Sequence, residues 1–96
     1  MPILSTTEID KRLEAVDGWR RDGHAIVRQF TFESFTDAVN FVARLVPRCE
    51  QADHHPDITI NYRRVTLSNS THSEGGVTEK DFAAAEAANA AFLASQ

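Results

Sequence analysis

The chain has 96 residues, of which 42% are hydrophobic and 25% are charged, and its net charge is −4 at pH 7. These values are typical of a globular protein and predict one domain over residues 1–96. The negative net charge argues against nucleic-acid binding, which needs clustered Lys and Arg. A membrane protein is not expected either, because no apolar run approaches the roughly 18–20 residues that span a bilayer.

The first third of the chain predicts a helix followed by a hairpin. Ser5 and Glu8 have the spacing of a capping box at the start of the helix, and Gly18 suits the position just after its end. Asp22-Gly23 then favours a two-residue turn. This turn would join a short strand to a longer one that runs from about His24 to Phe32.

The next segment returns to the helical period. Ser34 is the expected N-cap, and helix-compatible residues continue to Ala52. Pro47 removes an internal hydrogen bond and predicts a kink within this helix. The predicted apolar face consists of Phe35, Ala38, Val39, Val42, Leu45 and Val46.

The last part predicts a second hairpin and a closing helix. Two alternating segments, "DITINY" and "VTLSNSTH", are expected to join at Arg63-Arg64, and Thr78 is the expected N-cap of an alanine-rich helix. The inward-facing residues of that helix would be Phe82, Ala85, Asn89, Phe92 and Leu93. The order α-β-β-α-β-β-α predicts an α+β fold, in which a four-stranded antiparallel sheet carries its helices on one face.

The stretch "EQADHHP", residues 50–56, contains two of the four histidines of the chain. Pro56 disfavours the helical conformation for the residue before it, so the helix must end here. One histidine is explained by the helix C-terminus, where a partly charged imidazole is favourable. Two adjacent histidines between an acid and a proline favour a functional role over that explanation.

Two further residues have a local explanation as well as a functional one. His72 is at the end of the last predicted strand, on a wholly polar face with Thr66, Ser68 and Ser70. A histidine at the edge of a loop is commonly just exposed. Asp81 lies three residues after Thr78, where capping and the helix dipole are sufficient to account for a carboxylate.

A metal site is the weaker interpretation of these histidines. His54, His55, His72 and a carboxylate could in principle bind zinc. However, adjacent residues of an extended segment point to opposite sides, so His54 and His55 would seldom bind one ion. The HExxH and paired-cysteine patterns are also absent. We therefore expect no metal, and no catalytic role for Cys49.

Taken together, these residues resemble the pattern of the pterin-4a-carbinolamine dehydratases. That pattern is an acid, three residues, His-His-Pro, an aromatic residue, nine residues, a histidine, and an aspartate on the last helix. The residues that match it are Glu50, His54, His55, Pro56, Tyr62, His72 and Asp81. Trp19 and the "RQFTFESF" and "STH" stretches also look like family features. Departures are Pro47, Ser73 where another acid often stands, and Lys80 where arginine is common.

The resemblance implies dehydration of 4a-hydroxytetrahydrobiopterin to the quinonoid dihydropterin, by histidine acid–base catalysis and without a cofactor. It implies a catalytic set of His54, His55, His72 and Asp81. The implied substrate-binding residues are Asp53, His54, His55, Ser70, Thr71, His72 and Ser73. The residues that would support the catalytic side chains without contacting the substrate are Glu50, Trp19 and Pro56.

The resemblance leaves two classes of function open. The first is this lyase, working in tetrahydrobiopterin recycling. The second is a non-catalytic binding or dimerisation module, acting as a transcriptional cofactor or an assembly factor; the retained histidines favour the enzyme. Family members form homodimers or homotetramers, so a homo-oligomer is expected. With no signal-peptide pattern and one cysteine, we expect a cytoplasmic protein without nucleic-acid or membrane partners.

Overall fold

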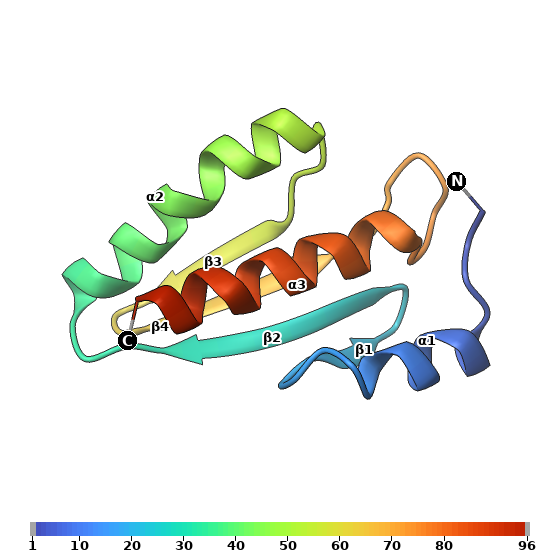
Figure 1. Ribbon diagram of the computed structural model, residues 1–96, viewed down its shortest axis with the longest axis horizontal. Helices are drawn as coiled ribbons and strands as arrows, with labels where there is room; N and C mark the ends of the chain where they lie inside the picture. The colour runs from blue at the N-terminus through green and yellow to red at the C-terminus, as the bar shows by residue number, and fades with distance from the viewer. Residues whose placement is uncertain (1, 96) are drawn as a thin grey trace.

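The computed structural model describes residues 2–95 and confirms the predicted fold class (Figure 1). Three helices and four strands follow one another in the order α-β-β-α-β-β-α. Their bounds are α1 Thr6–Leu13, β1 Arg20–Asp22, β2 Ala25–Thr31, α2 Phe35–Ala52, β3 Asp57–Asn61, β4 Arg64–Asn69 and α3 Glu79–Ala94.

The four strands form one antiparallel sheet in the order β1-β2-β4-β3. The long connection through α2 carries the chain past β4, so β3 forms one edge of the sheet (Figure 1). Residues that face each other across the strands share a face, as Ile26 and Asn69 do, or Ile58 and Leu67. This inner face lies under α2 and α3, which places the end of β4 close to both helices.

Side-chain caps fix where the helices begin. Ser5 and Glu8 form the predicted capping box of α1, and Ser34 accepts a hydrogen bond from the Asp37 backbone at the start of α2. Helix α2 then runs through Pro47 to Ala52. A second capping box joins Thr78 and Asp81 at the start of α3.

The core is held by aromatic rings at the end of the molecule opposite the start of α3. The rings of Phe30 and Phe41 lie 5.0 Å apart between centroids, and Phe92 of α3 lies 5.1 Å from Phe30. Such contacts add about 0.5–1.5 kcal/mol each beyond the area they bury. They fasten α2 and α3 to the sheet at one end.

Four sequence-based predictions are wrong in detail. The first hairpin turns at residues 23–24 rather than 22–23, because Asp22 is the last residue of β1 and pairs with Ala25. Helix α1 ends at Leu13, so Gly18 does not follow its end directly. Gly18 is favoured by its backbone instead, because at φ +85° any other residue is strained; a Cβ there would also lie 2.5 Å from the Nε atom of Arg28, which would have to move. The second hairpin turns at residues 62–63 rather than 63–64, with Tyr62 at φ 55°. Leu93 is 73% exposed rather than inward-facing.

The apolar face predicted for α2 is only partly covered. Ala38 and Leu45 are buried, whereas Phe35, Val39 and Val46 are exposed. A sheet of four strands is too narrow to cover the whole stripe, since β3 is the last strand on that side. One flank of α2 is therefore left on the surface.

Candidate active site

Three chain segments meet where α2 ends, β4 ends and α3 begins. They surround a polar pocket of about 560 Å³. Residues 53–57 and 70–73 line it, together with Lys80 from the first turn of α3. Pockets that bind small molecules commonly measure about 300–1,000 Å³, so this one has room for a two-ring molecule.

The end of α2 directs the two adjacent histidines. Asp53 adopts the left-handed conformation with φ 50°, which aspartate tolerates better than most residues. The His54 backbone N–H donates to the Cys49 carbonyl at 3.1 Å, which closes this cap. The chain then turns away from the helix axis. His54 consequently points beneath α3, while the side chain of His55 stays 54% exposed.

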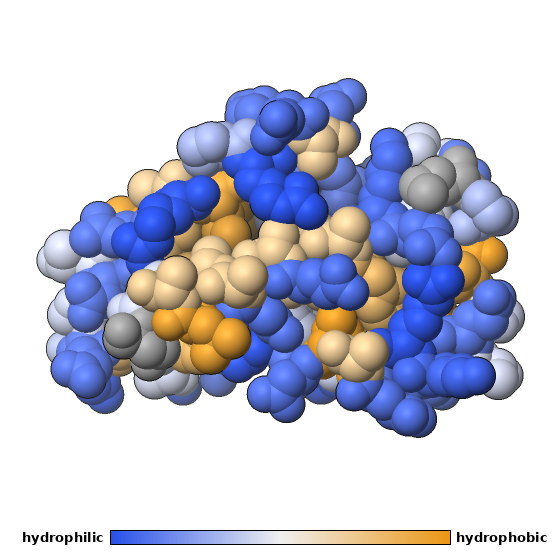
Figure 2. Space-filling model, viewed as in Figure 1, coloured by the Kyte–Doolittle hydropathy of each residue, from blue (hydrophilic) through white to orange (hydrophobic). Residues whose placement is uncertain are grey.

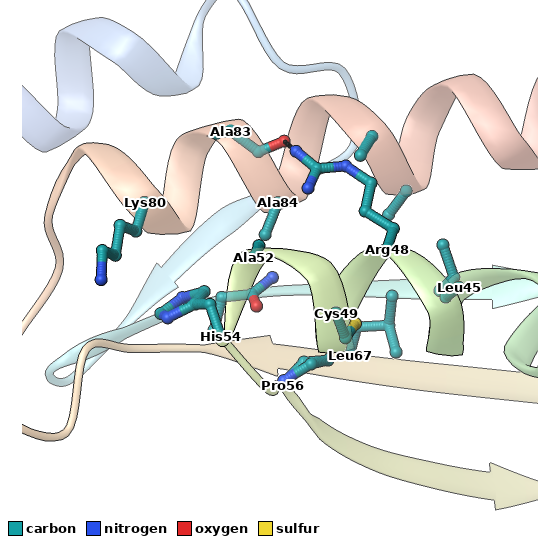
Figure 3. Close-up of a pocket in the computed structure, with 13 residues that line it drawn as sticks. Leu45, Arg48, Cys49, Ala52, His54, Pro56, Leu67, Lys80, Ala83 and Ala84 are labelled. Atoms are coloured by element: carbon teal, nitrogen blue, oxygen red, sulfur yellow. Dashed lines mark hydrogen bonds between the residues drawn. The ribbon is translucent and has the colours of Figure 1, made fainter.

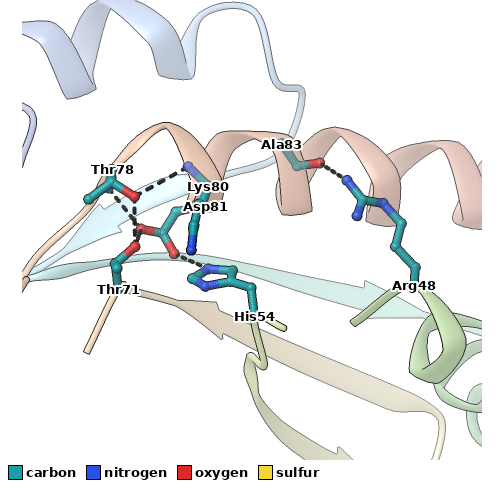
Figure 4. Close-up of polar contacts among 7 residues, drawn as sticks. All are labelled: Arg48, His54, Thr71, Thr78, Lys80, Asp81 and Ala83. Carbon is teal, nitrogen blue, oxygen red and sulfur yellow. Dashed lines mark hydrogen bonds and ion pairs between the residues drawn. The ribbon is translucent and has the colours of Figure 1, made fainter. Parts of the chain in front are cut away.

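His54 is paired with a buried carboxylate. Its Nε2 atom lies 2.7 Å from Oδ1 of Asp81, and the two side chains are 9% and 0% exposed (Figure 4). A carboxylate beside an imidazole nitrogen holds the ring in one orientation and fixes which nitrogen carries the proton. When the Nε2–H group of a neutral His54 donates to Asp81 Oδ1, the lone pair of the imidazole is on Nδ1.

The second oxygen of Asp81 is also fully engaged. Oδ2 accepts from the Thr78 backbone N–H at 2.8 Å and from the Thr71 hydroxyl at 2.9 Å (Figure 4). Because the Thr71 proton is given to Asp81, the Thr78 hydroxyl donates to Thr71 Oγ1, 2.7 Å away. These hydrogen bonds hold Oδ2 in place, so the carboxylate contacts His54 through its other oxygen, Oδ1. The same aspartate thus caps α3 and holds a histidine.

His55 and His72 lie in more exposed surroundings. His55 Nε2 is 3.3 Å from Oε2 of Glu50, whose side chain is 69% exposed, so this pair couples weakly. His72 stands in the loop closed by the bridge between Thr71 and Gly76. Both histidines line the polar pocket and are open to a ligand.

The structure brings most of the expected site residues together, but not all. Asp53, Ser70 and Ser73 line the pocket with the histidines. Thr71 also lines it, but its hydroxyl is used by Asp81, so this residue positions the aspartate. Trp19 is not brought to this site. Its indole is buried in the core and donates to Asn89, two turns further along α3 than Asp81.

Sequence reasoning did not assign Lys80 or Asp57 to the site, although both line the pocket. Lys80 precedes Asp81 at the helix start, and Asp57 follows Pro56. The one signal in the sequence was that each residue lies next to a predicted site residue, Asp81 or Pro56. Within residues 2–95, no group of three or more His, Cys, Asp or Glu side chains is arranged to hold a metal ion. Over the same range, no helix is both long enough and apolar enough to cross a membrane.

These features describe a class of protein: a small α+β fold that gathers three histidines and a buried aspartate around a polar pocket. The comparisons with known proteins identify the family. The family model for pterin 4 alpha carbinolamine dehydratase matches residues 2–91. The chain therefore belongs to the pterin-4-alpha-carbinolamine dehydratase family.

Individual relatives agree with this assignment. Proteins from Mycobacteroides abscessus and Sulfolobus acidocaldarius, whose names place them in this family, are 45% and 44% identical over 86 residues. These matches cover 90% of the chain and 92% and 94% of the relatives. A crystal structure of a transcriptional coactivator/pterin dehydratase from Brucella melitensis is 40% identical, with a TM-score of 0.89 over 93% of this chain and 97% of that one.

A more distant structure shares the fold alone. It is a pterin dehydratase-like protein described as a RuBisCO assembly factor in the alpha-carboxysome. It is 22% identical, with a TM-score of 0.67 over 78% of this chain and 89% of that chain. One fold therefore carries proteins described by different functions, and the chemistry must be argued from the site.

Proposed function

We propose that this protein dehydrates 4a-hydroxytetrahydrobiopterin to the quinonoid dihydropterin and water, by histidine acid–base catalysis, in the recycling of tetrahydrobiopterin. The observation that supports this proposal most strongly is the buried pair of His54 and Asp81 beside a polar pocket. A non-catalytic binding module would have no use for a buried carboxylate that orients an imidazole at a pocket wall.

The reaction needs two proton transfers. The bond between the 4a carbon and its hydroxyl oxygen breaks, and a proton must reach that oxygen for it to leave as water. A second proton must leave a ring nitrogen as the new double bond forms. Imidazole can donate or accept a proton near neutral pH, and such assistance is typically worth about 10²–10⁴-fold in rate.

His54 and His72 are the primary pair in this proposal, and they come from two different segments that line the pocket. His55 is shared between substrate binding and proton acceptance. Asp81 fixes the orientation of His54, which leaves Nδ1 as the nitrogen that exchanges a proton with the substrate. Asp53, Ser70 and Ser73 supply polar contacts to the pterin, and Glu50 steadies His55.

The proposed assembly is a homodimer or homotetramer. All residues of edge strand β3 are exposed, and one side of the strand lacks a neighbour within the described residues. Ile58 and Ile60 on this edge, with Phe35, Val39 and Val46 on α2, form an exposed apolar surface that we call the α2–β3 surface. An unpaired apolar edge strand favours association with another chain.

Stopped-flow absorbance tests the proposed reaction. Chemically generated 4a-hydroxytetrahydropterin is mixed with the protein without added metal, and formation of the quinonoid product is followed. We expect saturable acceleration above the buffer rate. A rate equal to that of buffer at every protein concentration would contradict the enzyme and leave the binding module as the explanation.

A further inference from the structure

The polar pocket of one chain lacks a component that a site for a flat two-ring molecule ordinarily has. Sites for small molecules are lined mainly by apolar and aromatic side chains, with a few polar groups among them. The described residues that line this pocket are polar or charged apart from Pro56, and none of them is Phe, Tyr or Trp. The imidazoles can transfer protons, but no aromatic side chain of the pocket covers the face of a bound ring. The pocket is therefore incomplete within a single chain.

Strand β3 begins at this pocket and forms an open edge of the sheet. Figure 3 shows His54 and Pro56 on the stretch of chain between α2 and β3. All residues of β3 are exposed, and no strand lies beyond it within residues 2–95. Apolar residues gather along α3 and toward α2 on the helical face (Figure 2), and Ile58 and Ile60 extend the inner face of the sheet to its edge. Strand β3 of a second copy would cover these side chains and pair the free backbone groups.

The residues of β3 select one antiparallel register for two copies. Residues that lie opposite each other share a face of the sheet, so Ile58 and Ile60 must meet inner-face residues of the second copy. With Thr59 opposite Thr59 of the second copy, Ile58 meets Ile60 and every residue of both strands is paired. A shift by two residues leaves one end of each strand without a partner.

Charge favours the same arrangement. Asp53 and Asp57 lie at the start of β3, whereas Arg63 and Arg64 follow its end. Within residues 2–95, none of these four side chains forms an ion pair. Antiparallel pairing brings the basic end of each strand to the acidic start of the other, where the opposite charges attract. Arg63 of the second copy would then lie beside His55.

The same pairing brings an aromatic ring to the pocket. Tyr62 is 67% exposed and has φ 55°, which is uncommon for a bulky residue. The guanidinium of Arg63 lies 5.4 Å from the centre of this ring. In the register centred on Thr59, Tyr62 of the second copy lies opposite Pro56, which lines the pocket. A residue left exposed in one chain thus reaches the site that lacks a ring.

We propose that a second copy of the chain completes the polar pocket: its β3 pairs antiparallel with β3, and its Tyr62 and Arg63 border the pocket. The Tyr62 ring packs against a bound pterin, and Arg63 offsets the charge of the acidic residues at the start of β3. Two-fold symmetry gives each chain's hairpin to the pocket of the other. This role for Tyr62 rests on the proposed pterin substrate, whereas the pairing of the strands does not.

A cysteine cross-link tests the register without any ligand. In a Cys49→Ser background, Thr59→Cys places two thiols opposite each other, with Cα atoms about 4.5–5.5 Å apart, as a disulfide requires. Oxidation should give a covalent dimer of the 10.7 kDa chain. Asn61→Cys is the matched control: its two copies would lie about 13 Å apart along the strands, so it should cross-link at least about tenfold more slowly. Equal rates, or no cross-link with Thr59→Cys, would overturn the proposal.

Calorimetric binding of 7,8-dihydrobiopterin, which has no 4a hydroxyl to lose, tests the role of Tyr62. Tyr62→Asn removes the ring, but asparagine tolerates a positive φ, so the turn and the mass measured by light scattering should be unchanged. We expect about tenfold weaker binding. Leu93→Asn, at an exposed apolar position outside the pocket, is the control and should bind as the parent does. Parent-like binding by Tyr62→Asn would overturn the proposal, whereas a parent that does not bind would contradict the proposed function.

Mixed oligomers show which chain supplies the ring. A pair made of one His72→Ala chain and one Tyr62→Asn chain has one intact pocket, with His72 from one chain and Tyr62 from the other. Refolding an equal mixture should therefore give parent-like affinity for the dihydropterin in about one quarter of all sites. If Tyr62 served the pocket of its own chain, every site would carry one defect. The absence of parent-like sites in the mixture would overturn the proposal.

Discussion

Asp81 performs two tasks with its two carboxylate oxygens. Oδ2 satisfies the Thr78 backbone N–H at the start of α3, and Oδ1 meets Nε2 of His54. The capping hydrogen bond already fixes the Asp81 side chain, so Oδ1 is held beside His54 without a further loss of side-chain entropy. The position of the candidate acid–base group is therefore tied to the start of a helix.

Asp81→Asn should damage both tasks. The amide nitrogen would face either the His54 Nε2–H or the hydrogen-bond donors at the helix start, so one buried donor loses its acceptor. We expect a loss of about 2 kcal/mol in the free energy of unfolding and a fall of about 10²-fold in dehydration rate. Asp37→Asn, in the exposed first turn of α2, is the matched control and should change neither quantity appreciably. Full activity of Asp81→Asn would show that His54 does not depend on this contact.

Burial raises the pKa of the Cys49 thiol above its ordinary value. Desolvation disfavours the thiolate, which is the reactive form, so less of it is present at a given pH. Alkylation by iodoacetamide at pH 8 should be slower in the folded protein than in urea, and its pH midpoint should be higher. Mass spectrometry of the labelled protein gives both rates. A folded-state midpoint equal to or below that of the unfolded chain would contradict the partial burial of Cys49.

At the scale of elements, the two ends of α3 have different roles. Its N-terminal turn carries Asp81, whereas its C-terminal half is fastened by Asn89. The Asn89 Oδ1 atom accepts from Trp19 Nε1 at 2.8 Å and from Arg28 Nη1 at 2.7 Å, and its Nδ2 atom donates to the Asp17 carbonyl. The segment after α1, strand β2 and helix α3 are joined through this one amide.

Asn89→Ala should destabilise the protein by about 2 kcal/mol, because the indole N–H of Trp19 and one Arg28 contact lose their acceptor. Urea unfolding followed by Trp19 fluorescence measures this change. Asn40→Ala, on the exposed surface of α2, is the control and should stay within about 0.5 kcal/mol of the parent. An Asn89→Ala variant as stable as this control would mean that the three elements are held by apolar packing alone.

At the scale of the whole molecule, the α2–β3 surface is an apolar part of the fold that the helices leave uncovered. Ile58 and Ile60 belong to the inner face of the sheet by their pairing with Leu67 and Val65, yet they are 38% and 37% exposed. The inner face therefore continues past the edge of the helical layer. Apolar residues in such a position favour burial against a second copy of the chain.

Charges on this surface should prevent assembly. The double variant Val46→Glu with Ile60→Lys should reduce the mass measured by light scattering to that of one 10.7 kDa chain, while the parent gives a multiple of it. Leu93→Lys alters an exposed apolar residue outside the α2–β3 surface, and it should assemble as the parent does. A monomeric parent, or a double variant that still assembles, would contradict this role for the surface.

The element order could be predicted from sequence because its signals are local. The capping box at Ser5 and Glu8 and the N-cap at Ser34 each involve neighbouring residues, and Asp22-Gly23 located the first hairpin turn to within one residue. The turn at Tyr62 could not be predicted, because a tyrosine with positive φ has no local signal. Periodicity likewise revealed the apolar stripe of α2 but not which part of it would be covered.

The site was less accessible to prediction than the fold. His54 and Asp81 are 27 residues apart, and capping alone explained Asp81 locally, so only the family resemblance linked the two residues. The left-handed conformation of Asp53 has no signature in the sequence, and neither has the Asn69 Oδ1 atom, which lacks a partner among residues 2–95, because both depend on how α2 and β4 meet in space. Trp19, a member of the same resemblance, lies in the core instead.

The central claim is that His54, held by Asp81, exchanges a proton with the substrate at the polar pocket. The most direct test is the stopped-flow dehydration rate of His54→Ala, measured beside His72→Ala and the parent protein. We predict that each variant loses about 10²-fold or more in rate at saturating substrate, since each removes one proton-transfer group. Rates near that of the parent in both variants would contradict the claim.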